Sequence, residues 1–156
     1  MRRVVLLCAL AALLSGCGGS SAPPEVTFAA GATSVVAKPT RYCDVKLQDC
    51  QSDANAPVRL AVPAGTALKV SVPAEISSTP WQVVFSYRSA NGSRTDGRSP
   101  VLTPDQHPDY TLQLPAATDA LVTAEVQQYG PPPQANTETG EIEFPIRATW
   151  VLTSTG

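Results

Sequence analysis

The chain has 156 residues, a formal net charge of −2 at pH 7, and only 15% charged residues. This mild acidity gives no support to nucleic-acid binding or to electrostatic adhesion to an anionic membrane. The length suits one domain with a sizeable core, and no internal repeat is visible.

The first residues form a predicted export signal. Arg2 and Arg3 precede an apolar run from Val4 to Leu14. That run is too short to cross a bilayer, because a membrane-spanning helix needs about 20 residues. A basic start followed by a short apolar stretch is typical of a secretory signal peptide. The run ends in the sequence LSGC at residues 14–17, which resembles the bacterial lipobox.

The lipobox resemblance implies that diacylglycerol is attached to the thiol of Cys17 and that the chain is cut just before it. The alternative is a plain signal peptide with an incidental cysteine. We predict a lipoprotein signal peptide at residues 1–16, a lipidated Cys17 on a flexible tether at 17–24, and one domain at 25–156. Membrane lipid is the expected partner of Cys17, because several acyl chains together hold a protein on a membrane. The expected location is the outer, extracytoplasmic face of the cell membrane.

The four cysteines have different expected roles. Cys8 falls in the signal peptide and Cys17 is the lipid site, which leaves Cys43 and Cys50. Export places this pair in an oxidising compartment, so we expect a structural disulfide worth about 2–3 kcal/mol. A redox pair and half of a metal site are the alternatives. However, the spacing is not C-x-x-C, and the sequence has no second Cys or His cluster.

Alternation of apolar and polar residues predicts β-strands along most of the mature chain, whereas helical periodicity is almost absent. Each set places its apolar members on one face of a sheet. These members are Val26/Phe28, Val58/Leu60/Val62, Leu68/Val70/Val72, Trp81/Val83/Phe85/Tyr87, Tyr110/Leu112/Leu114, Val122/Ala124/Val126 and Ile142/Phe144/Ile146/Ala148/Trp150/Leu152. Turn signals recur at short intervals, so we predict an all-β fold, an Ig-like antiparallel β-sandwich of about 7–9 short strands.

Three local signals refine this prediction. Asn91-Gly92 predicts a type I′ hairpin turn, which needs two residues tolerant of positive φ. Pro145 lies inside the last alternating run and predicts an edge strand or a bulge there. Trp81 resembles the core Trp of immunoglobulin-like domains, but the two mature cysteines are too close in sequence to form the inter-sheet disulfide of those domains.

His107 is the only histidine in the chain. It could ligate a metal together with Asp105 and Asp109, but ligands this close together rarely surround an ion, and no fourth group is evident. A Ser-His-Asp triad would also need His107, yet the sequence has no G-x-S-x-G motif. We favour a polar turn leading into the strand at Tyr110, and we expect no catalytic residue, no metal and no cofactor.

Two charged clusters are further candidates. The acidic cluster around residues 139–140 consists of Glu138, Glu141 and Glu143. Carboxylate pairs can perform acid–base chemistry, but we favour solvated charges that discourage edge pairing. The basic cluster flanks Asn91-Gly92 and consists of Arg88, Arg94 and Arg98. It could bind an anion or an acidic envelope glycan, and solvated loop charges are the alternative.

Three minor features complete the candidates. The sequence NGS at residues 91–93 fits a glycosylation sequon, but a turn explains it better in a bacterial protein. The three prolines at 131–133 either form a polyproline ligand or stiffen a loop. Tyr42, Tyr129 and Trp150 are candidate ligand-facing aromatics, although alternation already places Trp150 in the core.

Short segments that occur in order along the chain support a family resemblance. They are the lipobox, PEVTF at 24–28, YCD at 42–44 with Cys50, VSVP at 70–73, TPW at 79–81, GRS at 97–99, EVQQ at 125–128 and ATW at 148–150. Together they resemble a family of actinobacterial lipoproteins catalogued as domain of unknown function 2771. The resemblance implies an envelope location and the Cys43–Cys50 disulfide. It implies no reaction.

These observations predict a non-enzymatic, membrane-anchored cell-envelope lipoprotein that serves as a binding or structural module. The expected partner is another envelope protein, a lipid or a glycan, and not a nucleic acid. The alternative is an envelope enzyme or small-ligand carrier with a pocket at one end of the sandwich. An enzyme needs a concave pocket lined by several converging polar groups, so the position and lining of any pocket bear on this choice.

Overall fold

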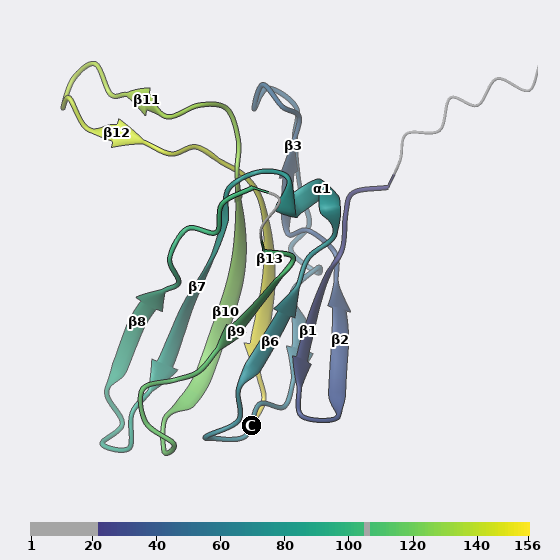
Figure 1. Ribbon diagram of the computed structural model, residues 1–156, viewed down its shortest axis with the longest axis vertical. Helices are drawn as coiled ribbons and strands as arrows, with labels where there is room; N and C mark the ends of the chain where they lie inside the picture. Colours follow the sequence, from purple (N-terminus) through teal and green to yellow (C-terminus); the bar gives the residue numbers. More distant parts are fainter. Residues whose placement is uncertain (1–21, 105–106) are drawn as a thin grey trace, which may run out of the picture.

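Two β-sheets lie face to face in a computed structural model (Figure 1), which describes residues 22–104 and 107–156. The predicted signal peptide, Cys17 and the tether up to residue 21 lie outside the described residues, as does Asp105. The one helix in the described chain, α1, spans Ala74–Ser77. Among these residues, no helix has the length and apolar character needed to cross a membrane.

The smaller sheet has four antiparallel strands in the order β2-β1-β6-β9. These strands are β1 (Val26–Ala30), β2 (Thr33–Ala37), β6 (Leu68–Ser71) and β9 (Asp109–Leu112). Leu68 and Val70 are buried while Lys69 between them is exposed, as the predicted alternation requires.

The larger sheet has seven strands in the order β4-β3-β13-β10-β7-β8, with β5 pairing in parallel with β13. These strands are β3 (Arg41–Cys43), β4 (Cys50–Ser52), β5 (Val58–Leu60), β7 (Trp81–Arg88), β8 (Arg94–Arg98), β10 (Ala120–Tyr129) and β13 (Ile146–Ser154). A two-stranded ribbon of β11 (Gln134–Ala135) and β12 (Ile142–Glu143) joins β10 to β13. The ribbon projects from one end of the sandwich (Figure 1).

The prediction of an all-β sandwich is confirmed. The described chain contains thirteen strands, more than expected, because five of them are only two or three residues long. Most such short pieces carry too few residues to show an alternating pattern of their own, although β5 coincides with the predicted alternation at Val58 and Leu60.

Large apolar side chains from both sheets form one core. Trp81, Trp150 and Phe28 belong to it and are fully buried. A buried indole N–H needs an acceptor. The indole N–H of Trp81 donates to the carbonyl oxygen of His107 at 3.2 Å, and that of Trp150 donates to the carbonyl oxygen of Pro24 at 2.9 Å. These bonds hold the segments that precede β9 and β1 against the core.

The last alternating run does not form a single strand. Pro145 separates β12 from β13, and the pairing of β13 with β10 shifts register beside this break. Pro145 therefore lies in a break between two strands, next to a bulge at Arg147 in β13 rather than within one, and the edge interpretation is wrong because β13 lies between β3 and β10. Ile142 and Phe144 are 64% and 59% exposed instead of lying in the core, because they lie on or next to the projecting ribbon.

Two other local predictions need correction. A bulge in β10 leaves Val122 without a partner in β7, so Leu121 is the residue that is buried there. The Asn91-Gly92 segment joins β7 to β8 as a hairpin, but within it only Gly92 has a positive φ, of 86°. A type I′ turn needs positive φ at both residues, so this turn is not type I′. It is stabilised by a hydrogen bond from the N–H of Ser93 to the side-chain oxygen of Asn91.

Candidate functional site

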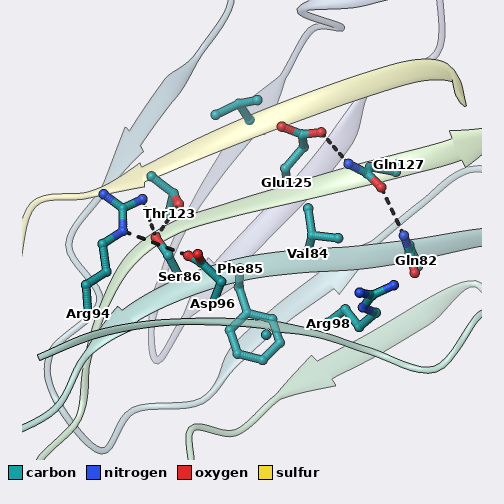
Figure 2. Close-up of a pocket in the computed structure, with 12 residues that line it drawn as sticks. Gln82, Val84, Phe85, Ser86, Arg94, Asp96, Arg98, Thr123, Glu125 and Gln127 are labelled. Atoms are coloured by element: carbon teal, nitrogen blue, oxygen red, sulfur yellow. Dashed lines mark hydrogen bonds and ion pairs between the residues drawn. The ribbon is translucent and has the colours of Figure 1, made fainter.

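An open groove crosses the outer face of the larger sheet (Figure 2). Its volume is about 540 Å³. Side chains from the adjacent strands β8, β7, β10 and β13 line it, so sheet register builds the site. The residues on these strands that line the groove are Gln82, Val84, Phe85, Ser86, Arg94, Asp96, Gly97, Arg98, Thr123, Glu125, Gln127 and Val151.

Amide and carboxylate groups form one hydrogen-bonded row in the groove. Gln82 Nε2 donates to Gln127 Oε1 at 2.9 Å, and Gln127 Nε2 donates to Glu125 Oε1 at 2.8 Å (Figure 2). Gln82 and Gln127 stand directly opposite each other in the pairing of β7 with β10. Because a carboxylate offers about four acceptor positions, Glu125 keeps acceptor capacity for a ligand.

Arg94 joins a second polar row in the groove. Its guanidinium donates to Ser86 Oγ at 3.0 Å, and the hydroxyls of Ser86 and Thr123 share a hydrogen bond of 2.8 Å. Arg94 Nε also lies 3.9 Å from Asp96 Oδ1. Both members of that ion pair are exposed, so the pair contributes little stability. The Arg94 side chain is 59% exposed, so solvent reaches it in the groove.

Two valines add apolar surface to the part of the groove between these rows. Val84 and Val151 flank Glu125, one on each neighbouring strand, in the register of the sheet. The charged lining residues comprise two cations and two anions, which are Arg94, Arg98, Asp96 and Glu125. The groove thus offers donors, acceptors and an apolar floor with balanced charge. These features suit a neutral polar ligand better than a free anion.

An aromatic pair extends the outer face beyond the groove. Tyr129 follows Gln127 by two residues on β10 and so lies on the same face. The rings of Tyr129 and Phe144 meet edge to face, with centroids 5.9 Å apart. Burial raises the pKa of the Tyr129 hydroxyl, and the positive charge of Arg98 opposes that rise. On β10, Tyr129 comes two residues after Gln127, which lines the groove, so its side chain follows that of Gln127 on the same face.

The disulfide hairpin of β3 and β4 is tied to the start of β13. Cys43 and Cys50 are bonded, as predicted, and stand directly opposite each other in the hairpin. Arg147 Nε donates to the carbonyl oxygen of Cys43 at 3.0 Å, and its guanidinium lies 5.1 Å from the centre of the Tyr42 ring. Tyr42 therefore packs under a cation of its own chain, an arrangement that stabilises the hairpin.

Asp44 organises the loop that the disulfide closes. Its Oδ1 accepts hydrogen bonds from the backbone N–H groups of Gln48 at 2.7 Å and Asp49 at 3.2 Å. The bond from Gln48 is the main reason that the pKa of Asp44 is lowered, and the positive charge of Lys46 also lowers it. The loop thus favours the ionised carboxylate.

A smaller cavity, of about 270 Å³, lies at the end of the sandwich where β1 begins. Its lining combines the start of the described chain with the β3–β4 hairpin and includes Ala22, Pro23, Glu25, Lys38, Tyr42 and Asp53. This is the position predicted for a pocket in the enzyme or carrier alternative. The larger cavity, with more converging polar groups, lies instead on the face of the sheet.

The segment around His107 does not join the groove. His107 is exposed, and its carbonyl oxygen accepts the hydrogen bond from the indole of Trp81. Asp109 forms an ion pair with Lys69 at 3.6 Å and accepts a hydrogen bond from Ser71 Oγ. Within residues 22–104 and 107–156, no three His, Cys, Asp or Glu side chains form a group that could hold a metal.

The charged clusters separate in the structure. Arg94 and Arg98 line the groove, whereas Arg88 does not. The acidic cluster lies on the projecting ribbon and is exposed, and Glu143 accepts a hydrogen bond from Asn136 Nδ2 at 2.8 Å. Trp150 is buried in the core, as alternation predicts.

Sequence reasoning missed most of the polar groove residues as a group. Alternation already places Gln82, Val84 and Ser86 on the solvent side of one strand, so part of the signal was present. Glu125 and Gln127 follow the same rule on β10. What the alternation lacks is the register that sets Gln82 opposite Gln127.

The fold and the groove define an all-β sandwich protein with a polar, open groove on one sheet face. The chain matches a family model described as "Protein of unknown function (DUF2771)" over residues 20–155, and it belongs to that family. The predicted membership of domain of unknown function 2771 is thereby confirmed. No curated protein and no solved structure matches the chain.

Proposed function

We propose that this protein is a lipid-anchored binding module of an actinobacterial cell envelope, and that the groove is its ligand-binding surface. The observation that carries the proposal is the convergence of two hydrogen-bonded side-chain rows, from Gln82 to Glu125 and from Arg94 to Thr123, on one concave face. An outer sheet face without a binding role needs no such organised groups, since water satisfies scattered polar side chains.

The predicted anchor is compatible with this arrangement. Ala22 comes five positions after Cys17, so even an extended chain holds Ala22 within about 18 Å of the Cys17 Cα atom. β1 begins at the end of the sandwich from which the ribbon of β11 and β12 projects (Figure 1). Anchoring at Cys17 would therefore hold this end of the sandwich near the membrane.

The anchor is tested by fractionating cells that express the full chain. We expect the Cys17→Ala variant to lose fatty-acid labelling and to leave the membrane fraction, because the thiol that carries the lipid is gone. Cys8→Ala is the matched control, since it removes a cysteine from the predicted signal peptide without touching the lipid site. Equal membrane retention and labelling of wild type and Cys17→Ala would overturn the anchor.

The binding role is tested by co-sedimentation of the detergent-solubilised full chain with insoluble envelope material from the producing bacterium. We expect Gln127→Ala and Arg94→Ala each to weaken retention by about tenfold, the usual effect of losing well-placed hydrogen bonds. Lys69→Ala removes an exposed cation from the other sheet and is the control. If the groove variants bind like wild type, or the control weakens binding equally, the groove is not the binding surface.

A further inference from the structure

The groove does not end at its hydrogen-bonding rows. Tyr129 lies on the same strand and face as Gln127, and two residues of a β-strand span about 6.6 Å. The Tyr129 ring contacts that of Phe144 at 5.9 Å between centroids. An elongated molecule lying in the groove along β10 therefore meets an aromatic pair next.

Phe144 is held at the surface by the local chain. Its side chain is 59% exposed. Phe144 lies between the end of β12 and Pro145, and the carbonyl oxygen of Pro145 accepts a hydrogen bond from the N–H of Gly130 at 2.8 Å. Together with the edge-to-face contact to Tyr129, this bond fixes the ring beside the sheet. An exposed aromatic ring positioned in this way offers a flat apolar face to a ligand.

The chemistry of the combined surface fits a sugar chain. Each sugar hydroxyl both donates and accepts, which matches adjacent amide, carboxylate and guanidinium groups such as Gln127, Glu125 and Arg94. The C–H faces of a sugar ring are apolar, which matches the floor at Val84 and the ring of Phe144. Balanced charge in the groove disfavours a strongly acidic polymer, and the polar rows disfavour a lipid chain.

We infer that the groove and the Tyr129–Phe144 pair form one continuous site for a neutral polysaccharide chain, in which Phe144 stacks on a sugar ring beyond those held in the groove. This inference rests on the proposed binding role of the groove and names its ligand class. It predicts that affinity rises with chain length, because only a longer chain reaches both parts of the site.

The test uses the full chain in detergent and a protein-free, deacylated neutral polysaccharide from the envelope of the producing bacterium, with its fragments of about two and about eight sugar units. We expect the longer fragment to bind at least about tenfold more tightly than the shorter one. Phe144→Ala should abolish this advantage while leaving binding of the short fragment unchanged. Phe144→Tyr should retain the advantage, whereas Phe144→Leu should lose it, because leucine is apolar but has no ring face. Binding should be insensitive to salt.

The control for the ribbon is Ile142→Ala, which removes a similarly exposed apolar side chain nearby. The stacking role would be overturned if Ile142→Ala and Phe144→Ala reduced the affinity advantage of the longer fragment equally. It would also be overturned if Phe144→Leu kept that advantage in full. Retention on whole envelope material without binding to the polysaccharide would overturn the ligand class but leave the proposed function intact. In that case, loss of retention after protease treatment of the envelope would indicate a protein partner. Absence of retention on any envelope material would instead contradict the proposed function itself.

Discussion

Leu47 packs directly over Gly130. The position that a Cβ atom would take on Gly130 lies 3.2 Å from Leu47 Cδ2 and 3.3 Å from Arg147 Cβ. Leu47 reaches this place from the disulfide loop with a φ of 59°, and in the described chain it is the only non-glycine residue with positive φ. This conformation is costly for leucine, and the packing of its half-buried side chain against Gly130 offsets part of the cost.

The contact predicts a non-additive pair of substitutions. Gly130→Val should destabilise the protein by about 1–3 kcal/mol, because the new side chain overlaps Leu47 and Arg147. In a Leu47→Ala background the same change should cost less, since the obstructing methyl groups are gone. Urea unfolding of the four members of this cycle measures the coupling. Additive free energies of unfolding would show that Leu47 and Gly130 are not in contact.

Removal of the disulfide should loosen both its own loop and the base of the ribbon. The double variant Cys43→Ala/Cys50→Ala should lose about 2–3 kcal/mol of stability, because the reduced loop regains conformational freedom in the unfolded chain. Limited proteolysis of the folded variant should also cut the ribbon at residues 136–141 faster than in wild type. An unchanged cutting rate with lower stability would mean that the disulfide loop does not brace the ribbon.

The carboxylate of Asp44 predicts a specific pH dependence. Its pKa is lowered in the folded protein, mainly by the backbone N–H of Gln48, so its charge stabilises the fold above the ordinary carboxyl pKa. That stabilisation should disappear as the pH falls through the lowered folded pKa of this carboxyl. Asp44→Asn keeps an acceptor oxygen but removes the charge. The gap in melting temperature between wild type and this variant should therefore be present at pH 7 and close in acid; a gap independent of pH would contradict the assignment.

Gly97 leaves room for the ring of Phe85, its cross-strand partner in β7. A Cβ on Gly97 would lie 2.6 Å from Phe85 Cζ, closer than atoms tolerate. Gly97→Ala should thus destabilise the protein by about 1–3 kcal/mol, and Phe85→Leu should restore part of the loss. Thr95→Ala, at an exposed position of the same strand, is the control. Thermal unfolding provides the test. A lower melting temperature for Thr95→Ala than for Gly97→Ala would refute this account.

Gln128 predicts a further ordering of variants. Its Nε2 donates to the carbonyl oxygen of Glu75 and to Thr79 Oγ1, both at 2.9 Å, while its buried Oε1 has no partner among the described residues. Gln128→Met should cost about 1–2 kcal/mol by removing both bonds, and Gln128→Glu should cost more at neutral pH, because a buried carboxylate would face a carbonyl oxygen. Acid should reduce the Gln128→Glu penalty by protonating that group. Equal unfolding free energies for both variants at neutral pH would disprove this ordering.

Much of the fold was accessible from local patterns. Alternation identified the strands around Trp81 and Trp150, because each side chain's face follows from its position in the strand. Alternation wrongly placed Ile142 and Phe144 in the core. The alternating pattern continues across Pro145, whereas the strand itself is interrupted there. Alternation also named the wrong buried residue near Val122. The bulge there inserts one residue into β10, which exchanges the two faces, so that Leu121 is buried.

The amino-acid order alone was enough to predict an export signal, a candidate lipid site at Cys17, the all-β class and the pairing of Cys43 with Cys50. These properties depend on neighbours in the chain, so they are written in short segments. Only the tertiary structure decided that Gln82, Gln127, Glu125 and Arg94 share one groove and that the ring of Phe144 contacts that of Tyr129. The reason is that sheet register sets distances between residues more than forty positions apart, and register is fixed by packing of the whole core rather than by any local pattern.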